Sequence, residues 1–563
     1  MKLSNNQLKI LLLGSNLIPW DKLEVAAREA DLKNLSLLEY LPSTNLVTPD
    51  QLGKIVAEEL KISFANLREE KLDEKLLNLI PERVARARGV IIFEKNDNFA
   101  KVGMTDPDDI EIMHLVQKKI GKKIIPYYIT KHDLEYALGK YKGSAQEKFK
   151  KILQKLKNKS ISATQKDELT VEIVDVILEY GYQSKASDIH IEPFINEVMI
   201  RFRVDGILHD VLNVPKQLLE LVVSRIKIMA KMRTDEHRAA QDGKISFKTA
   251  LEDLDVRVSI LPTAAGEKVV MRLLSSKNRN YGLEDLGFFD DNLKLINQTI
   301  KNPHGMILVT GPTGSGKTTT VYGILKILNK REINISSIED PVEYNVEGVN
   351  QIQVNNKTNL TFANGLRAIL RQDPDIIMIG EIRDEETANI AVNSALTGHL
   401  VLSTLHTNDA ATTLPRFLEM GIEPFLVAST VNVAIAQRLV RRICRKCIMS
   451  YQISEDELRI IERSKAIQNI LKSEGCTDFK KLRFYKGLGC PVCGNTGFAG
   501  RIGVFEILEM TERIRGLVID RVNSDEILKA AKEEGMTVML HDGIRKIFNG
   551  ETTLMEVVRV TMD

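Results

Sequence analysis

Short apolar runs followed by helical patterns dominate the second half of the chain. Such runs occupy Met306–Thr310, Ile376–Glu381 and Leu400–Thr404, and we expect a further strand at Ile333–Ile338. The first run precedes Thr319–Lys330, where apolar residues recur with the period of a helix. Strands that alternate with helices in this way predict a mainly parallel sheet covered by helices.

The first half shows two other patterns. The runs Val90–Phe93, Ala100–Met104 and Ile124–Tyr128 alternate with helical segments and predict a small α/β domain. In Val198–Val204, by contrast, every second residue is apolar, as in a strand with one buried face. With further strands at 256–260 and 268–274, this segment predicts a second α/β domain.

These patterns divide the chain into three domains and a linker. We expect an N-terminal domain over 1–145, a linker rich in Lys, Gln and Ser over 146–167, a second domain over 168–280 and a third over 281–563. The length of 563 residues agrees with this division, because single cores rarely exceed about 300 residues.

Composition narrows the function classes. The net charge is only +2, from 78 basic and 76 acidic residues, so overall charge gives no support for nucleic-acid binding. No apolar run reaches the roughly 20 residues that a membrane span needs. The apolar start, Leu8–Leu13, is short and contains Lys9, so we do not interpret it as a secretory signal. The chain is expected in the cytoplasm, where its five cysteines stay reduced unless a metal holds them.

A phosphate-binding loop follows the first apolar run. Residues 311–318 fit the pattern G-x-x-x-x-G-K-[ST], and they read Gly311, Pro312, Thr313, Gly314, Ser315, Gly316, Lys317 and Thr318. Glycines let backbone N–H groups curl around phosphate oxygens, and the following helix adds its positive end, including Thr319. We expect Lys317 to reach the β- and γ-phosphates of ATP and the Thr318 hydroxyl to ligate Mg²⁺.

Carboxylates follow two neighbouring predicted strands. Glu381 ends one of them and is well placed to hold the Mg²⁺ shell, unless it only caps a helix. Glu339, Asp340 and Glu343 follow another, and one of them can activate the attacking water. Spacing alone does not choose between these three, and a solvated acidic turn is the alternative. His406 follows the strand Leu400–Thr404 and can sense the γ-phosphate or serve a structural role.

Two cysteine pairs predict a structural zinc site. Cys444 and Cys447 form one C-x-x-C pair, and Cys490 and Cys493 form the other. Four thiolates can surround Zn²⁺ tetrahedrally and leave no position for water. A redox pair or unbound thiols are the alternatives.

Together, the motifs resemble those of the type II/type IV secretion ATPase family. They are 311–318, Glu339–Glu343, Asp373–Asp384 and Thr397–Asp409, in the family order Walker A, Asp box, Walker B and His box. The upstream segments Ala186–Pro193, Arg201–Gly206 and Gln241–Gly243 also resemble the second N-terminal domain of that family. The resemblance implies a multidomain α/β protein: a RecA-like ATPase core, a PAS-like second domain, a helical and mixed N-terminal domain and a zinc-binding insertion. Within residues 281–563, it places the insertion at 440–500 and C-terminal helices at 505–563.

The resemblance also implies roles for individual residues. Glu343 is the water-activating base, Glu381 is the Walker B acid, and His406 lies near the γ-phosphate with His399 close by. Arginines of the second domain are implied to meet the nucleotide, although each could instead form a structural salt bridge; the candidates are Arg201, Arg203, Arg225, Arg238 and Arg257. Around Arg238 the chain departs from the family, with His237 and Ala240 in place of a basic residue and a proline.

The resemblance further implies a hexameric cytoplasmic motor, peripheral to the inner membrane, that drives type IV pilus assembly. Its partners would be an inner-membrane platform protein and a docking protein of the membrane complex. The cysteine cluster favours assembly, because pilus-retraction ATPases typically lack it. Rival interpretations are a type II secretion motor, a DNA-pulling motor and a signalling adaptor. Aromatic residues make up only 5% of the chain without an interleaved basic run, so we expect no nucleic acid.

A weak repeat near the start bears on cyclic di-GMP, which some family members bind through an Arg early in each of two repeats. Asn16-Leu17-Ile18 recurs 29 residues later as Asn45-Leu46-Val47. By that offset the arginine positions hold Gln7 and Ser36, and neither side chain can pair bidentately with a phosphate. The sequence therefore argues against dinucleotide binding and favours docking to a membrane-complex partner.

Overall fold

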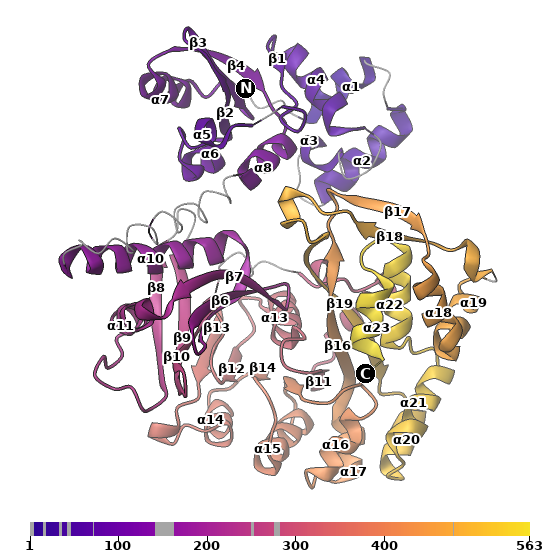
Figure 1. Cartoon of the computed structure of the whole chain (residues 1–563). Helices are drawn as coiled ribbons and strands as arrows, with labels where there is room; N and C mark the ends of the chain where they lie inside the picture. The colour runs from indigo at the N-terminus through magenta and orange to yellow at the C-terminus, as the bar shows by residue number, and fades with distance from the viewer. Residues whose placement is uncertain are drawn as a thin grey trace. The chain divides into compact units, whose positions relative to one another are not determined.

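The helices and strands of the computed structural model divide between two units, Met1–Ser276 and Lys277–Asp563 (Figure 1). The structure describes residues 5–14, 18–32, 37–41, 47–70, 72–140, 152, 163–248, 253–274, 282–476 and 478–562. Ser36, Asn16, Asn45 and most of the predicted linker lie outside these ranges. None of the helices in the described ranges combines the length and apolarity needed to cross a bilayer.

The first part of unit 1 is helical and then mixed, as the pattern predicted. Its sheet has the order β1-β4-β3-β2, and the strands are β1 (Ser63–Phe64), β2 (Val90–Lys95), β3 (Phe99–Met104) and β4 (Lys123–Tyr128). Its helices are α1 (Asn5–Gly14), α2 (Trp20–Leu32), α3 (Leu37–Tyr40), α4 (Pro49–Glu59), α5 (Glu74–Leu77), α6 (Glu82–Arg88), α7 (Ile110–Ile120) and α8 (Lys131–Lys140). Apolar runs of the predicted strands fill the core: Val90, Ile91 and Ile92 are fully buried.

The second part of unit 1 is a six-stranded antiparallel sheet with the order β7-β6-β5-β10-β9-β8. Its strands are β5 (Ala186–Pro193), β6 (Glu197–Val204), β7 (Ile207–Pro215), β8 (Gln241–Lys248), β9 (Asp253–Thr263) and β10 (Gly266–Leu274). Apolar residues of one face, such as Ile200 and Phe202, pack with helices α10 (Ala163–Gln183) and α11 (Leu219–Met229). The alternation predicted for residues 198–204 is therefore confirmed. Helix α10 begins inside the predicted linker, because Gln, Lys and Glu are good helix formers that extend it beyond its apolar part.

Unit 2 is built on a seven-stranded sheet with the order β13-β12-β14-β15-β11-β16-β19. Its strands are β11 (Gly305–Thr310), β12 (Ile335–Glu339), β13 (Val349–Gln353), β14 (Ile376–Ile379), β15 (Leu400–Leu405), β16 (Val431–Ile443) and β19 (Phe498–Glu509). All neighbouring pairs are parallel except β16 with β19. The predicted mainly parallel sheet is confirmed.

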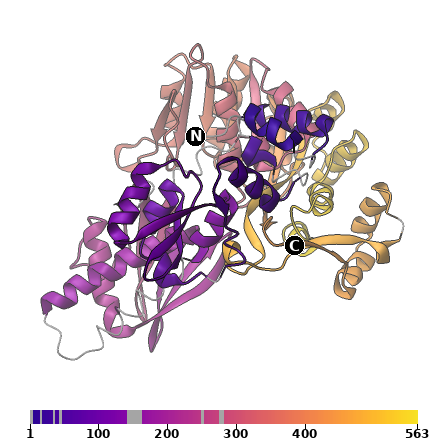
Figure 2. The same ribbon diagram turned by 90° about the horizontal axis from the view of Figure 1, so that it is seen from above.

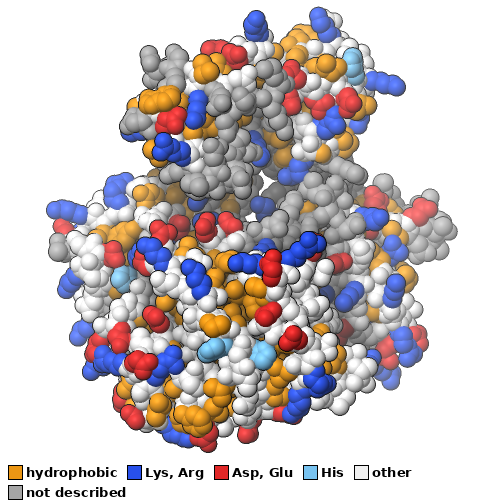
Figure 3. Space-filling model, turned by 180° about the vertical axis from the view of Figure 1, so that it is seen from behind, with side chains coloured by type: hydrophobic (Ala, Val, Ile, Leu, Met, Phe, Trp, Pro, Cys, Tyr) orange, Lys and Arg blue, Asp and Glu red, His pale blue; other side chains and the backbone are white. Residues whose placement is uncertain are grey.

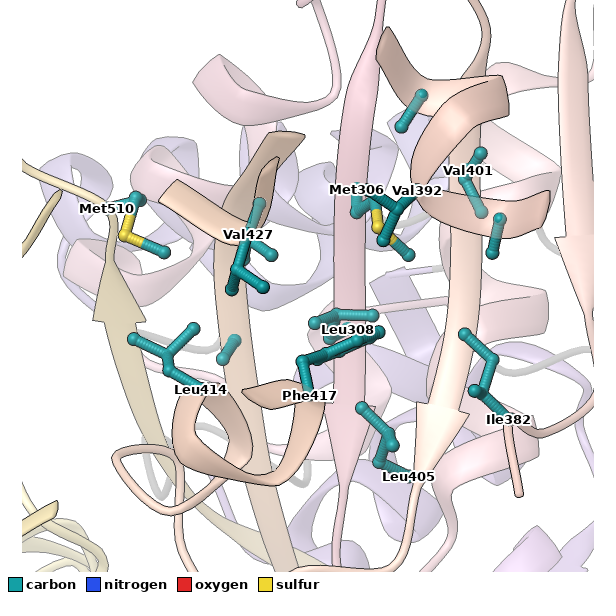
Figure 4. Packing of buried hydrophobic residues seen from close by; sticks show 14 of the residues in the cluster. Met306, Leu308, Ile382, Val392, Val401, Leu405, Leu414, Phe417, Val427 and Met510 are labelled. Carbon is teal, nitrogen blue, oxygen red and sulfur yellow. The ribbon is translucent and has the colours of Figure 1, made fainter. Parts of the chain in front are cut away.

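Both faces of this sheet are buried under helices. Along β11, Met306 and Leu308 belong to one apolar cluster, and Ile307 and Val309 belong to another on the opposite face. The first cluster includes residues of α14 (Phe362–Ile369), α15 (Glu385–Leu396), α16 (Thr413–Glu419), α17 (Pro424–Thr430), α20 (Glu512–Ile519) and α21 (Ser524–Glu533). Figure 4 shows Leu308 on β11 and Phe417 on α16, which belong to this cluster. The second cluster includes residues of α12 (Asp290–Thr299) and α13 (Lys317–Leu328).

An insertion separates β16 from β19. It contains the two-stranded ribbon β17 (Ile448–Gln452) and β18 (Arg483–Gly487), and the helices α18 (Glu455–Arg463) and α19 (Lys465–Ser473). Figure 2 shows this orange segment set to one side of the large sheet. The chain ends in α22 (Met539–Phe548) and α23 (Leu554–Thr561). The segment predicted to be helical from residue 505 thus starts inside β19, where apolar residues pair with β16 over a long register.

Acidic and basic side chains are interspersed over the face of the molecule drawn in Figure 3. This mixture agrees with the near balance of 78 basic and 76 acidic residues.

Candidate functional site

The phosphate-binding loop joins the end of β11 to the start of α13. Gly311, Gly314 and Gly316 have φ angles of +144°, +80° and +91°, which side-chain-bearing residues rarely adopt. Lys317 Nζ donates hydrogen bonds to the carbonyl oxygens of Gly311 at 2.7 Å and Pro312 at 3.2 Å. The ammonium group therefore crosses the concave side of the loop.

The loop has properties that fit a bound polyphosphate. The Ser315 hydroxyl is buried and has no hydrogen-bond partner among the described residues. Thr318 and Thr319 are half-buried in the first turn of α13, whose N-terminal end is positive. Burial lowers the pKa of Lys317, and the negative charge of Glu381 only partly opposes this shift.

Glu381 follows β14 and lies among basic groups. His406 Nε2 donates to Glu381 Oε2 at 3.0 Å, and Arg383 forms an ion pair with Glu381 Oε1 at 2.5 Å. The hydrogen bonds of Ser403 to Ile379 O and of Thr404 to Gly380 O tie the ends of β14 and β15 together. The structure therefore brings Glu381, His406 and Lys317 to one edge of the sheet.

Of the three candidate carboxylates at the end of β12 and just beyond it, Glu339 is held by hydrogen bonds within the protein core. It is 2% exposed and accepts hydrogen bonds from the hydroxyls of Tyr322 and Ser337 and from Gln351 Nε2. Burial, and then the bond to Glu339, raise the pKa of Tyr322. These bonds hold Glu339 inside the protein, where it is shielded from solvent.

Glu343 and Asp340 lie on the loop beyond Glu339. Asp340 is exposed and Glu343 is half-buried. The ring of Tyr322, whose hydroxyl donates to Glu339, packs edge-on against that of Tyr344, the residue after Glu343, at 4.7 Å between centroids. The buried Glu339–Tyr322 pair thus supports the loop that carries Glu343.

The structure does not bring His399 to the phosphate loop. His399 precedes β15, whereas His406 follows it, and β15 runs parallel to β11 with Leu405 beside Thr310. Six strand residues span about 20 Å, so His399 lies at the opposite edge of the sheet. There its Nδ1 is 2.9 Å from Ser394 O.

The five candidate arginines all belong to unit 1. Arg201, Arg203 and Arg257 lie on the polar face of the six-stranded sheet, Arg225 lies on α11, and Arg238 lies between α11 and β8. Arg201 is paired with Glu192 at 2.5 Å, and Arg203 lies 3.8 Å from Asp188. Salt bridges within the sheet therefore hold these two side chains in place. A structural salt bridge is one of the two roles that the sequence left open for them.

The four cysteines of the two C-x-x-C pairs meet in the insertion. Their sulfur atoms all lie within 4.8 Å of one another, with Cys444–Cys490 and Cys447–Cys493 at 3.9 Å and Cys490–Cys493 at 3.7 Å. Tetrahedral Zn²⁺ with Zn–S bonds of about 2.3 Å separates its ligand sulfurs by about 3.8 Å, so the cluster has the size of such a site.

Two polar contacts at the site were not predicted from the sequence. Thr310, at the end of β11, exchanges hydrogen bonds with Thr407, directly after His406. Gln437 of β16 contacts the phosphate loop through Ser315. The mostly apolar residues of 431–436 could have indicated β16, but no local pattern links that strand to a loop about 120 residues earlier.

A parallel sheet with a glycine-rich loop at the end of one strand and a carboxylate at the end of another defines a P-loop nucleotide hydrolase. The sequence model of the family described as Type II/IV secretion system protein matches residues 163–559, and that of the MshEN domain matches residues 60–148. The chain therefore belongs to the type II/IV secretion system protein family.

Individual relatives agree with this assignment. The Type IV pilus assembly ATPase PilB of Myxococcus xanthus is 37% identical over 97% of both chains, and that of Pseudomonas aeruginosa is 37% identical over 98% of both. Type II secretion system protein E of P. aeruginosa is 45% identical over 70% of this chain and 76% of its own. The Legionella pneumophila ATPase DotB shares the fold, with a TM-score of 0.50 and 20% identity over 69% of this chain and 95% of its own. The resemblance and the enzyme class, ATPase, predicted from the four motifs are confirmed.

Proposed function

We propose that the chain is the motor ATPase of type IV pilus assembly. The observation that carries the proposal is the match to two pilus assembly ATPases over at least 97% of both chains, N-terminal part included. A motor of type II secretion is the second candidate, favoured by identities to secretion proteins E of 45% over 70% of this chain and of 37% over 96% of this chain.

In the proposed site, ATP lies with its phosphates on residues 311–319. Lys317 leaves the carbonyl groups that it now contacts and reaches the β- and γ-phosphates. Thr318 and Glu381 would hold Mg²⁺, which would neutralise charge on the phosphates. Glu343 takes the proton of the attacking water, which is the role that the family resemblance implies for it, whereas Glu339 is held by three donors. His406, held by Glu381, faces the γ-phosphate.

The second part of unit 1 is proposed to complete the site in a ring of six subunits. Arg201 and Arg203 are held in place by acidic neighbours and would meet the phosphate charge, and the same role is proposed for Arg225, Arg238 and Arg257. Closure around ATP and opening after hydrolysis would move the units as rigid bodies. In the cytoplasm, this motion would act on an inner-membrane platform protein, while the N-terminal domain docks on the membrane complex.

The insertion is proposed to hold one structural Zn²⁺ on Cys444, Cys447, Cys490 and Cys493. The spacing of their sulfur atoms supports this, and Cys493 Sγ also accepts hydrogen bonds from the backbone N–H groups of Cys490 and Gly497. All four ligand positions come from the protein, so the metal would stabilise the fold of the insertion and take no part in catalysis.

A turnover assay tests the proposed chemistry. Glu343→Gln is expected to lower ATP hydrolysis about 10²–10⁴-fold and to retain ATP binding, because it removes only the base. Glu347→Gln, the same change at an exposed position of the same segment, serves as the control. Equal turnover in both variants would refute the role of Glu343. Pilus assembly that persists in Glu343→Gln cells would indicate a signalling adaptor instead of a motor.

A further inference from the structure

Gln437 lies against the phosphate loop and makes one hydrogen bond with the loop and one with the first turns of α13. The side chain is 2% exposed. Its Nε2 donates to Ser315 O at 2.7 Å, and its Oε1 accepts from the Thr320 hydroxyl at 2.6 Å. A carbonyl oxygen can only accept, so the Ser315 contact fixes which end of the amide is the nitrogen.

The glycines of the loop are packed against the same residue. A Cβ atom at Gly311 would lie 2.4 Å from the Gln437 backbone oxygen, and one at Gly316 would lie 2.7 Å from Gln437 Nε2. The backbone and the side chain of Gln437 therefore pack against the phosphate loop at Gly311 and at Gly316.

The bond to Ser315 determines the direction of the next N–H group. In a planar trans peptide, the carbonyl of Ser315 and the N–H of Gly316 point in opposite directions. Because the carbonyl points at Gln437, the N–H points away from β16, into the loop. Inward N–H groups are what phosphate-binding loops offer to their ligand.

We propose that Gln437 is a positioning residue for nucleotide binding: by holding the Ser315 carbonyl, it aims the Gly316 N–H at the phosphates. Gln437 itself does not touch the nucleotide. The proposal rests on the proposed function, since it presumes that residues 311–319 bind ATP. In this role Gln437 makes β16 part of the nucleotide site, although none of the four sequence motifs includes a residue of β16.

Gln437→Glu tests this directly, because it keeps the shape of the side chain and replaces the donor with an acceptor facing Ser315 O. Isothermal titration of the full-length chain with ADP in the presence of Mg²⁺ should show a Kd raised at least tenfold, and steady-state assays should show a raised KM for ATP. Thr320→Val leaves the Ser315 bond in place and should change the Kd less than threefold. Gln298→Glu, the same substitution at an exposed position of α12, serves as the control.

The outcomes separate the proposal from its alternatives. A purely structural role for Gln437 would lower the folded, active fraction, and with it kcat and the number of binding sites, at unchanged Kd and KM. That result would overturn the proposal, as would wild-type affinity in Gln437→Glu. If Gln437→Glu does not fold, Gln437→Leu, which removes the donor without adding charge, must show the same rise in Kd. If the wild-type chain and Gln298→Glu also fail to bind ADP, the proposed nucleotide site itself is refuted.

Discussion

Glu339 and Glu343 are only four residues apart, yet their surroundings differ. Spacing left Glu339, Asp340 and Glu343 open as the catalytic base, because a sequence does not show which carboxylate the core has already taken up. The structure places three donors on Glu339 and leaves Glu343 on the adjoining loop. The phosphate loop and Glu381, by contrast, were predictable, because each directly follows a strand whose apolar run is visible in the sequence.

This difference leads to a prediction at the residue scale. Glu339→Gln should lower the free energy of unfolding by about 1–3 kcal/mol, because an amide cannot accept all the donors that surround the carboxylate. Glu343→Gln should change it by less than about 0.5 kcal/mol, as expected for a residue outside the core. Urea unfolding of the two variants measures both values. Equal destabilisation would contradict the structural role of Glu339.

At the scale of elements, strands buried on both faces were the most predictable part of the fold. β11, β14 and β15 are largely apolar runs, as parallel strands buried on both faces usually are. The pairing of β16 with β19 was not predictable, because the cysteine insertion separates the two strands in the sequence. The C-terminal helix α23 also contacts β16 across a long distance in the sequence. Glu556 accepts hydrogen bonds from the backbone N–H and the guanidinium of Arg441, and it forms an ion pair with Arg559.

The pKa of Glu556 gives a pH-dependent prediction for this contact. Burial raises the pKa, but the hydrogen bonds from Arg559 and Arg441 outweigh burial and lower it from 4.5 to about 2. A lowered carboxyl pKa contributes stability that is present above about pH 4.5 and is lost as the pH falls toward about 2. Glu556→Gln should therefore cost about 2 kcal/mol at pH 7 and clearly less at pH 3. Urea unfolding at the two pH values checks this, and an equal cost at both would contradict the ion pair.

At the scale of the whole molecule, the zinc prediction concerns a part of unit 2 that is separate from the nucleotide site. The cysteine spacing predicted the site, and the structure brings the four sulfurs together from segments 46 residues apart in the chain. The relation between the arginines of unit 1 and the phosphate loop of unit 2 was implied by family resemblance alone, since no local pattern carries information about contacts between units.

Metal removal tests the independence of the two sites. The purified chain should contain about one zinc per subunit, released by a mercurial reagent that modifies the four thiols. Release should increase proteolysis of residues 444–497 and leave the Kd for ADP within about threefold. A Cys476→Ser chain, changed outside the cluster, should keep its zinc. The assignment would be contradicted if the purified chain contained no zinc. It would also be contradicted if the double variant Cys447→Ser and Cys493→Ser still bound zinc.

The central claim is that ATP turnover at this site drives pilus assembly. The most direct measurement uses cells that carry Lys317→Ala in the native gene: surface filaments are counted by electron microscopy, and released protein is assayed from the same culture. The proposed function predicts that filaments disappear and secretion continues. Filaments that persist while secretion stops would contradict it and identify the chain as the motor of type II secretion.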